Sequence, residues 1–121
     1  AVLEGVAFSL KQVAELMEQM PGFKPQSEIV VSGGGSKSRL WRQIIADVFG
    51  LPVLQTYGAA EGGAFGAALV AGAGCGLWEN LTSAMELLQV QDVTKPSKDA
   101  EKYQAPYQRY CKLYQALQAL E

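Results

Sequence analysis

The strongest candidate for a binding site is the run GGGSKS at residues 33–38, which stands between a β-branched run and an amphipathic stretch. Glycine tolerates positive φ angles and lets the backbone approach a ligand closely. A helix that follows such a turn presents unpaired N–H groups and the positive end of its dipole, which suits a nucleotide phosphate or another anion. The run therefore predicts a ligand-binding turn, with a tight strand-to-helix connection as the alternative.

The run does not complete either of the common nucleotide signatures. A P-loop needs a glycine directly before its lysine, and the residue before Lys37 is a serine. The dinucleotide fingerprint needs glycine in its sixth position, where Ser38 stands. The local chemistry therefore favours a nucleotide without identifying one.

A second unusual segment is EGGAFGAA at residues 61–68. Small residues in series on a helix are typical of close packing against a neighbouring backbone. The functional alternative is a hinge between two lobes, where closely packed helices slide or rotate.

The chain offers no evident catalytic group. It contains no histidine, which excludes imidazole catalysis and histidine metal sites. None of its three aspartates, Asp47, Asp92 and Asp99, adjoins a nucleophile or a second carboxylate. The two cysteines, Cys75 and Cys111, are interpreted as reduced thiols of a cytoplasmic protein. We therefore predict neither a catalytic residue nor a metal site within the chain.

Hydrophobic periodicity predicts the elements that position these segments. The pattern predicts helices over residues 1–20, 39–49, 58–71 and 79–89, short strands over 29–31 and 53–56, a linker over 90–102, and a C-terminal helix within 103–121 that carries a tyrosine stripe. The continuous β-branched run at residues 29–31 indicates a strand covered on both faces, as in a parallel sheet. On the amphipathic helix over 39–49, Arg42 and Asp47 fall on the polar side.

This alternation predicts an α/β fold with short parallel strands packed between helices. Two strands are too few for a sheet that normally has about five. The 121-residue chain is therefore expected to be part of a larger domain. Its exposed sheet edges predict self-association into a homo-oligomer or marginal stability alone.

The composition excludes further classes of protein. With 49% hydrophobic and 18% charged residues, the chain is not disordered. A net charge of −2 leaves no basic stripe for nucleic acid. The longest apolar segment, residues 62–76, is too short to cross a membrane and rich in glycine. We expect a cytoplasmic protein with neither nucleic acid nor membrane as a partner.

Several blocks in order give a more specific indication. The chain resembles the C-terminal part of the FGGY carbohydrate kinases, and most closely their xylulokinase-like branch, at residues 30–38 (VVSGGGSKS), 40–43 (LWRQ), 46–48 (ADV), 50–53 (GLPV) and 61–68 (EGGAFGAA). Residues 3–8 (LEGVAF) also resemble the helix that precedes this block in the family.

The resemblance implies the fold of the sugar kinase, Hsp70 and actin superfamily, in which two RNase H-like lobes enclose ATP. It also implies transfer of the γ-phosphoryl group of ATP, with Mg²⁺, to a hydroxyl of a sugar or polyol. Carried over by position, Gly34 lies against the adenine or ribose, and Ser38 takes the place of a polar residue that contacts the adenine. Gly33 and Gly35 shape the turn, and residues 61–68 match the connection between the lobes.

The family's general base, phosphate-binding loops and sugar-binding residues have no counterpart in this chain. Residues 1–121 are therefore interpreted as the C-terminal part of the second, nucleotide-side lobe of a kinase. The chain alone is expected to be inactive, and xylulose is the expected substrate of the whole enzyme. Two alternatives stay open: a separate nucleotide-binding module without catalysis, and a structural module whose glycines serve only turns.

Overall fold

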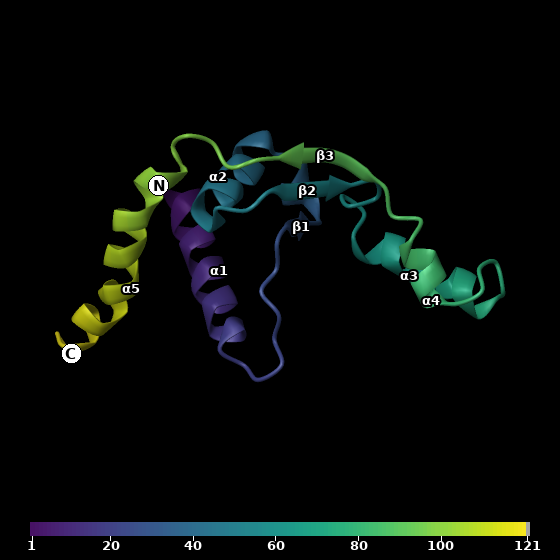
Figure 1. Ribbon diagram of the computed structural model, residues 1–121, viewed down its shortest axis with the longest axis horizontal. Helices are drawn as coiled ribbons and strands as arrows, with labels where there is room; N and C mark the ends of the chain where they lie inside the picture. The colour runs from purple at the N-terminus through teal and green to yellow at the C-terminus, as the bar shows by residue number, and fades with distance from the viewer. Residues whose placement is uncertain (121) are drawn as a thin grey trace.

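The computed structural model describes residues 1–120 of the chain as helices arranged around a small sheet (Figure 1). In chain order the elements are α1 (Val2–Glu18), β1 (Ile29–Val31), the 3₁₀ turn η1 (Gly34–Lys37), α2 (Arg39–Phe49), β2 (Val53–Thr56), α3 (Gly63–Gly74), α4 (Leu81–Met85), β3 (Val90–Thr94), the 3₁₀ turn η2 (Ala100–Tyr103) and α5 (Gln104–Gln118). The pair α3 and α4 lies at one end of the molecule and α5 at the other.

The first half of the chain confirms the predicted helix–strand–helix–strand order. β1 and β2 pair in parallel, with Ile29 opposite Val53. Helix α2 begins where the side chain of Ser38 accepts a hydrogen bond from the backbone N–H of Trp41, and it ends at Gly50, whose φ of 67° is left-handed. Both ends therefore follow from local capping chemistry.

The segment expected to be a linker, residues 90–102, instead contains a third strand. β3 pairs antiparallel with β2, so that the sheet is mixed and has the order β1-β2-β3. Apart from Thr94, the residues of β3 are exposed. A strand with solvent on both faces carries no alternating apolar pattern, which is why this strand was missed in a polar segment.

The strand β1 also differs from the expectation. It was expected to be covered on both faces, but Val30 is 59% exposed. β1 lies at one edge of the sheet, with its other side unpaired among residues 1–120.

The boundaries of α3 and α4 differ from the predicted ones. α3 begins at Gly63 rather than at residue 58, because Gly58 and Gly62 adopt positive φ angles of 81° and 41° in the preceding turns. It extends past Gly72, which was expected to end it. α4 is shorter than its predicted range and begins after Asn80, whose side chain accepts a hydrogen bond of 2.8 Å from the N–H of Ser83.

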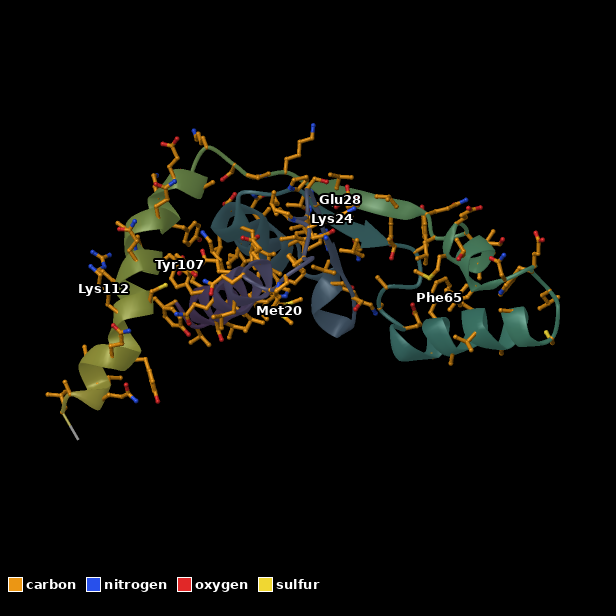
Figure 2. All side chains as sticks on the ribbon, turned by 60° about the horizontal axis from the view of Figure 1, so that its bottom comes forward. Met20, Lys24, Glu28, Phe65, Tyr107 and Lys112 are labelled. Carbon is orange, nitrogen blue, oxygen red and sulfur yellow. The ribbon has the colours of Figure 1, made fainter. Side chains whose placement is uncertain are left out.

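The main core lies where α1, α2 and α5 meet. Its buried members are Ala7, Phe8, Ile44, Val48 and Tyr107. The rings of Tyr103, Tyr107 and Tyr110 surround Phe8 with centroid distances of 5.6–6.1 Å, which confirms that this part of the tyrosine stripe docks a helix on the core. The end of the predicted stripe, Tyr114 and Leu117, is exposed instead. Figure 2 shows Tyr107 on the side of α5 that faces α1, and Lys112 on the opposite side.

Helix α2 buries two charged side chains that were predicted to face solvent, Arg42 and Asp47. Asp47 accepts hydrogen bonds from the backbone N–H of Ser97, at 2.6 Å, and from its hydroxyl, at 2.9 Å. These two hydrogen bonds hold the segment after β3 against α2. Periodicity placed Asp47 on the polar side correctly, but that side is covered by a segment distant in sequence.

Gly72 gives α3 its close contact with the segment that connects α3 to α4. A Cβ at this position would collide with the ring of Trp78, whose indole N–H donates to the carbonyl of Leu69 at 2.8 Å. We expect Gly72→Ala to destabilise the helix pair by about 1–3 kcal/mol, the usual cost of overpacking. Amide hydrogen exchange across residues 63–85 measures this loss. Gly74→Ala, where the added Cβ meets no atom within 4 Å, is the matched control and should leave exchange unchanged.

No helix within residues 1–120 combines the length and the apolar content that spanning a bilayer requires.

Candidate functional site

Two glycine-containing turns lie side by side at the carboxyl ends of β1 and β2. The turn at residues 33–38 follows β1, and the turn at residues 57–62 follows β2. The backbone N–H of Gly33 donates to the carbonyl of Ala59 at 2.6 Å, which joins the two turns. Ligands of open α/β sheets characteristically bind at the carboxyl ends of parallel strands. The sequence-predicted glycine run therefore stands where this class of fold places a ligand.

The three glycines of the run have different structural reasons. Gly33 has φ 81° and ψ −177°, a combination that is essentially restricted to glycine. A Cβ at Gly35 would lie 3.4 Å from the Trp41 ring, at the close limit of ordinary van der Waals contact. A Cβ at Gly34 would meet no atom within 4 Å. Gly33 thus serves the turn through its φ angle and Gly35 packs beside Trp41, while an added Cβ would meet open space at both Gly33 and Gly34.

Ser38 stands at the start of α2 with an exposed side chain. Its hydroxyl oxygen accepts from the N–H of Trp41 at 3.2 Å, and its own N–H donates to the carbonyl of Gly35 at 3.1 Å. The residue therefore has a definite structural role as a helix cap. A contact between Ser38 and an adenine stays a prediction.

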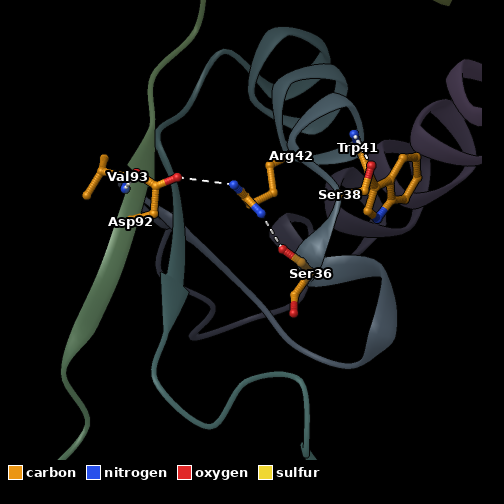
Figure 3. Close-up of polar contacts among 6 residues, drawn as sticks. All are labelled: Ser36, Ser38, Trp41, Arg42, Asp92 and Val93. Carbon is orange, nitrogen blue, oxygen red and sulfur yellow. Dashed lines mark hydrogen bonds and ion pairs between the residues drawn. The ribbon is translucent and has the colours of Figure 1, made fainter.

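Beneath the turn lies a polar network that sequence reasoning missed (Figure 3). Ser36 is 1% exposed, and its hydroxyl donates to the carbonyl of Gly33 at 2.7 Å. One guanidinium nitrogen of Arg42 donates to the carbonyl of Ser36 at 2.5 Å, and another pairs with Asp92 at 3.1 Å. Arg42 and Asp92 are 50 residues apart, so no local sequence pattern connects them.

The segment 61–68 is partly turn and partly helix. Glu61 and Gly62 belong to the turn before α3, and α3 begins at Gly63. The ring of Phe65 packs over Gly58, where an added Cβ would lie 2.6 Å from the ring. A role for this segment in connecting two lobes stays a prediction.

The described part of the chain brings together no cluster of side chains that would bind a metal. Across residues 1–120, no three His, Cys, Asp or Glu side chains come together to hold a metal ion. Burial, and then a hydrogen bond with Glu4, raises the pKa of Tyr103 to about 12. Tyr103 packs against the core. The turns therefore offer exposed backbone and hydroxyl groups, and the described residues form no metal-ligating cluster.

Comparison with known proteins agrees with this picture. Residues 1–75 match the model of the FGGY family of carbohydrate kinases, C-terminal domain. The chain is 36% identical over 126 residues to a probable L-xylulose kinase of Haemophilus influenzae, covering 100% of this chain and 24% of the relative. It is 34% identical over 107 residues to a glycerol kinase of Saccharolobus islandicus, covering 88% of this chain and 21% of the relative.

Among solved structures, the ligand-bound xylulose kinase of Lactobacillus acidophilus superimposes with a TM-score of 0.81 and 30% identity, over 98% of this chain and 24% of that one. The similarity confirms the α/β fold as that of the C-terminal lobe of a sugar kinase. The chain spans only about a quarter of the length of the relatives that it matches.

Proposed function

The chain belongs to the FGGY family of carbohydrate kinases, and we propose that it is the nucleotide-side C-terminal part of an enzyme that phosphorylates a hydroxyl of a sugar or polyol with ATP. The observation that carries the proposal is the position of the glycine turn, whose backbone is open at Gly33 and Gly34, at the carboxyl ends of two parallel strands. Close approach of a flat ligand to bare backbone needs such a position.

In the proposed complex, four residues of the chain hold the nucleoside. Gly34 presents its backbone to the adenine or ribose, and Ser38 directs its hydroxyl towards the adenine. Gly33 and Gly35 fix the turn, the first through its glycine-only conformation and the second by leaving room for the Trp41 ring. The chain thus contributes orientation, which is the main protein contribution to phosphoryl transfer.

The remaining chemistry belongs to residues outside this chain. The family resemblance implies Mg²⁺, which neutralises phosphate charge during such transfers. The described residues contain no cluster of acidic ligands for it. We therefore assign to this chain neither the metal ligands nor the base that removes the proton from the sugar hydroxyl.

Xylulose is the proposed substrate. Support comes from the probable L-xylulose kinase and from the xylulose kinase structure named above. The glycerol kinase among the relatives makes a polyol the competing substrate class.

We also assign the enzyme to the cytoplasm, where the two free thiols of this chain would stay reduced. The unpaired edges of β1 and β3 favour pairing with further strands, either of the longer protein or of a second copy.

The experiment is a coupled ADP-release assay with ATP and Mg²⁺ across pentuloses, hexoses and polyols. We expect the full-length protein that contains this chain to turn over xylulose, and the 121-residue chain alone to give only background. Turnover by the purified chain alone would contradict the assignment of the base to other residues. A full-length protein that binds ATP but phosphorylates no acceptor would favour the nucleotide-binding module instead.

A further inference from the structure

Resting on the proposed function, we propose that Arg42 is a positioning residue for the nucleotide. Its guanidinium holds residues 33–38 in the conformation that receives the nucleoside, and Asp92 on β3 orients that guanidinium. Arg42 itself touches no part of the ligand, since it acts from beneath the turn (Figure 3).

Arg42 is connected to the glycines through Ser36. The side chain is only 4% exposed, and its Nη1 donates to the carbonyl of Ser36 at 2.5 Å. Ser36 in turn donates its hydroxyl to the carbonyl of Gly33 at 2.7 Å. The carbonyl that precedes Gly34 is therefore fixed through two hydrogen bonds by a side chain of α2. Hydrogen bonds from a buried charged donor are stronger than neutral ones.

Asp92 orients the guanidinium from β3. Its Oδ2 lies 3.1 Å from Nη2 of Arg42, and its Oδ1 accepts from the N–H of Val93 at 3.0 Å, which fixes the carboxylate. A planar guanidinium can bond the Ser36 carbonyl and the Asp92 carboxylate at once. The compact ammonium of a lysine cannot reproduce this two-directional fork. Strand β3 is thereby linked to the shape of the turn.

Burying the Arg42 side chain has a free-energy cost. Nε of Arg42 is buried without a hydrogen-bond partner among the described residues. The partner of the buried guanidinium, Asp92, is half-exposed, so the ion pair is weak evidence for a role in stability, and a buried donor without a partner is unfavourable. A polar network that is only partly satisfied fits a role in setting the geometry of the turn better than a role in stabilising the fold.

The test compares Arg42→Lys and Asp92→Asn in the full-length protein. Arg109→Lys, at an exposed position of α5, is the matched control. One readout is amide hydrogen exchange at Ser36 and Ser38, whose N–H groups are bonded within the turn. The other is calorimetric affinity for ATP and, separately, for xylulose. We expect Arg42→Lys to accelerate exchange and weaken ATP binding by about tenfold each, as the loss of a charged hydrogen bond implies.

Asp92→Asn should act in the same direction by a few-fold, and it should add nothing in the Arg42→Lys background. Xylulose affinity should stay within about twofold of the parent. Loss of a residue with a merely structural role would instead weaken the binding of both ligands. Parental exchange at the turn, parental ATP affinity, or equal loss of both ligands in folded variants would overturn the inference. If Arg42→Lys does not fold, the half-exposed Asp92 still permits the decision through Asp92→Asn.

The two proposals fail in different ways. If the parent protein does not bind ATP at all, the proposed function is wrong, and an exchange effect of Arg42→Lys would then describe a structural tie only. If the parent binds ATP and Arg42→Lys leaves that affinity intact, only the role of Arg42 is wrong.

Discussion

Gly34→Val in the full-length protein is expected to weaken ATP binding by about 10- to 100-fold while leaving xylulose binding unchanged. A Cβ at this position meets no protein atom within 4 Å and Gly34 does not adopt a positive φ angle, so the chain itself should fold normally. It would instead occupy the space assigned to the nucleoside, and overpacking of this kind costs about 1–3 kcal/mol. Calorimetric titration with each ligand measures both affinities.

Two control variants show whether the effect of Gly34→Val is specific to ATP binding. Ser38→Ala removes one hydroxyl that also caps α2. It should weaken ATP binding less than Gly34→Val, since one hydrogen bond is worth about 0.5–1.5 kcal/mol net. Gly62→Val places a branched residue at φ 41°, beside Gly33, and should impair both ligands or folding. A Gly34→Val protein that folds and binds ATP like the parent would reduce the glycine run to a simple turn.

Phe8→Ala is expected to produce the largest loss of stability, about 3–5 kcal/mol. Phe8 is 7% exposed and stands against three tyrosine rings, so its removal leaves a cavity between α1 and α5. Native-state amide exchange in the full-length protein should show the opening free energy of α5 falling by this amount. Leu10→Ala, on the same helix but 45% exposed, should have a much smaller effect. Unchanged protection of α5 in Phe8→Ala would mean that other contacts hold this helix.

The elements predicted well from sequence are those whose causes are local. The start and the end of α2 follow from Ser38 and Gly50, and the β-branched run at residues 29–31 forms β1. The tyrosine spacing identified the buried face of α5 because a helix repeats its contacts every three or four residues.

The misses have long-range causes. β3 contains the strand-favouring residues Val90, Val93 and Thr94, but it lacks an alternating apolar pattern, and it is held as a strand by hydrogen bonding to β2. Arg42 is buried because the turn and β3 cover it, and helical periodicity alone cannot distinguish a covered polar side from a solvated one. The glycine run was located from sequence, but the network that holds it depends on contacts across 50 residues.

The path of the chain between β2 and β3 has a consequence for how the molecule can vary. The N–H of Tyr57 donates to the carbonyl of Gln89 at 2.9 Å, so the chain leaves the sheet and returns to it at neighbouring points. In the language of protein engineering, the α3–α4 pair is an insertion with adjacent ends. Segments of this kind are exchanged, lengthened or shortened with little effect on their host. The part of this insertion beyond residue 75, where the family match ends, includes α4 and can therefore diverge between homologues while the pairing of β2 with β3, and with it Asp92 beneath the turn, keeps its alignment.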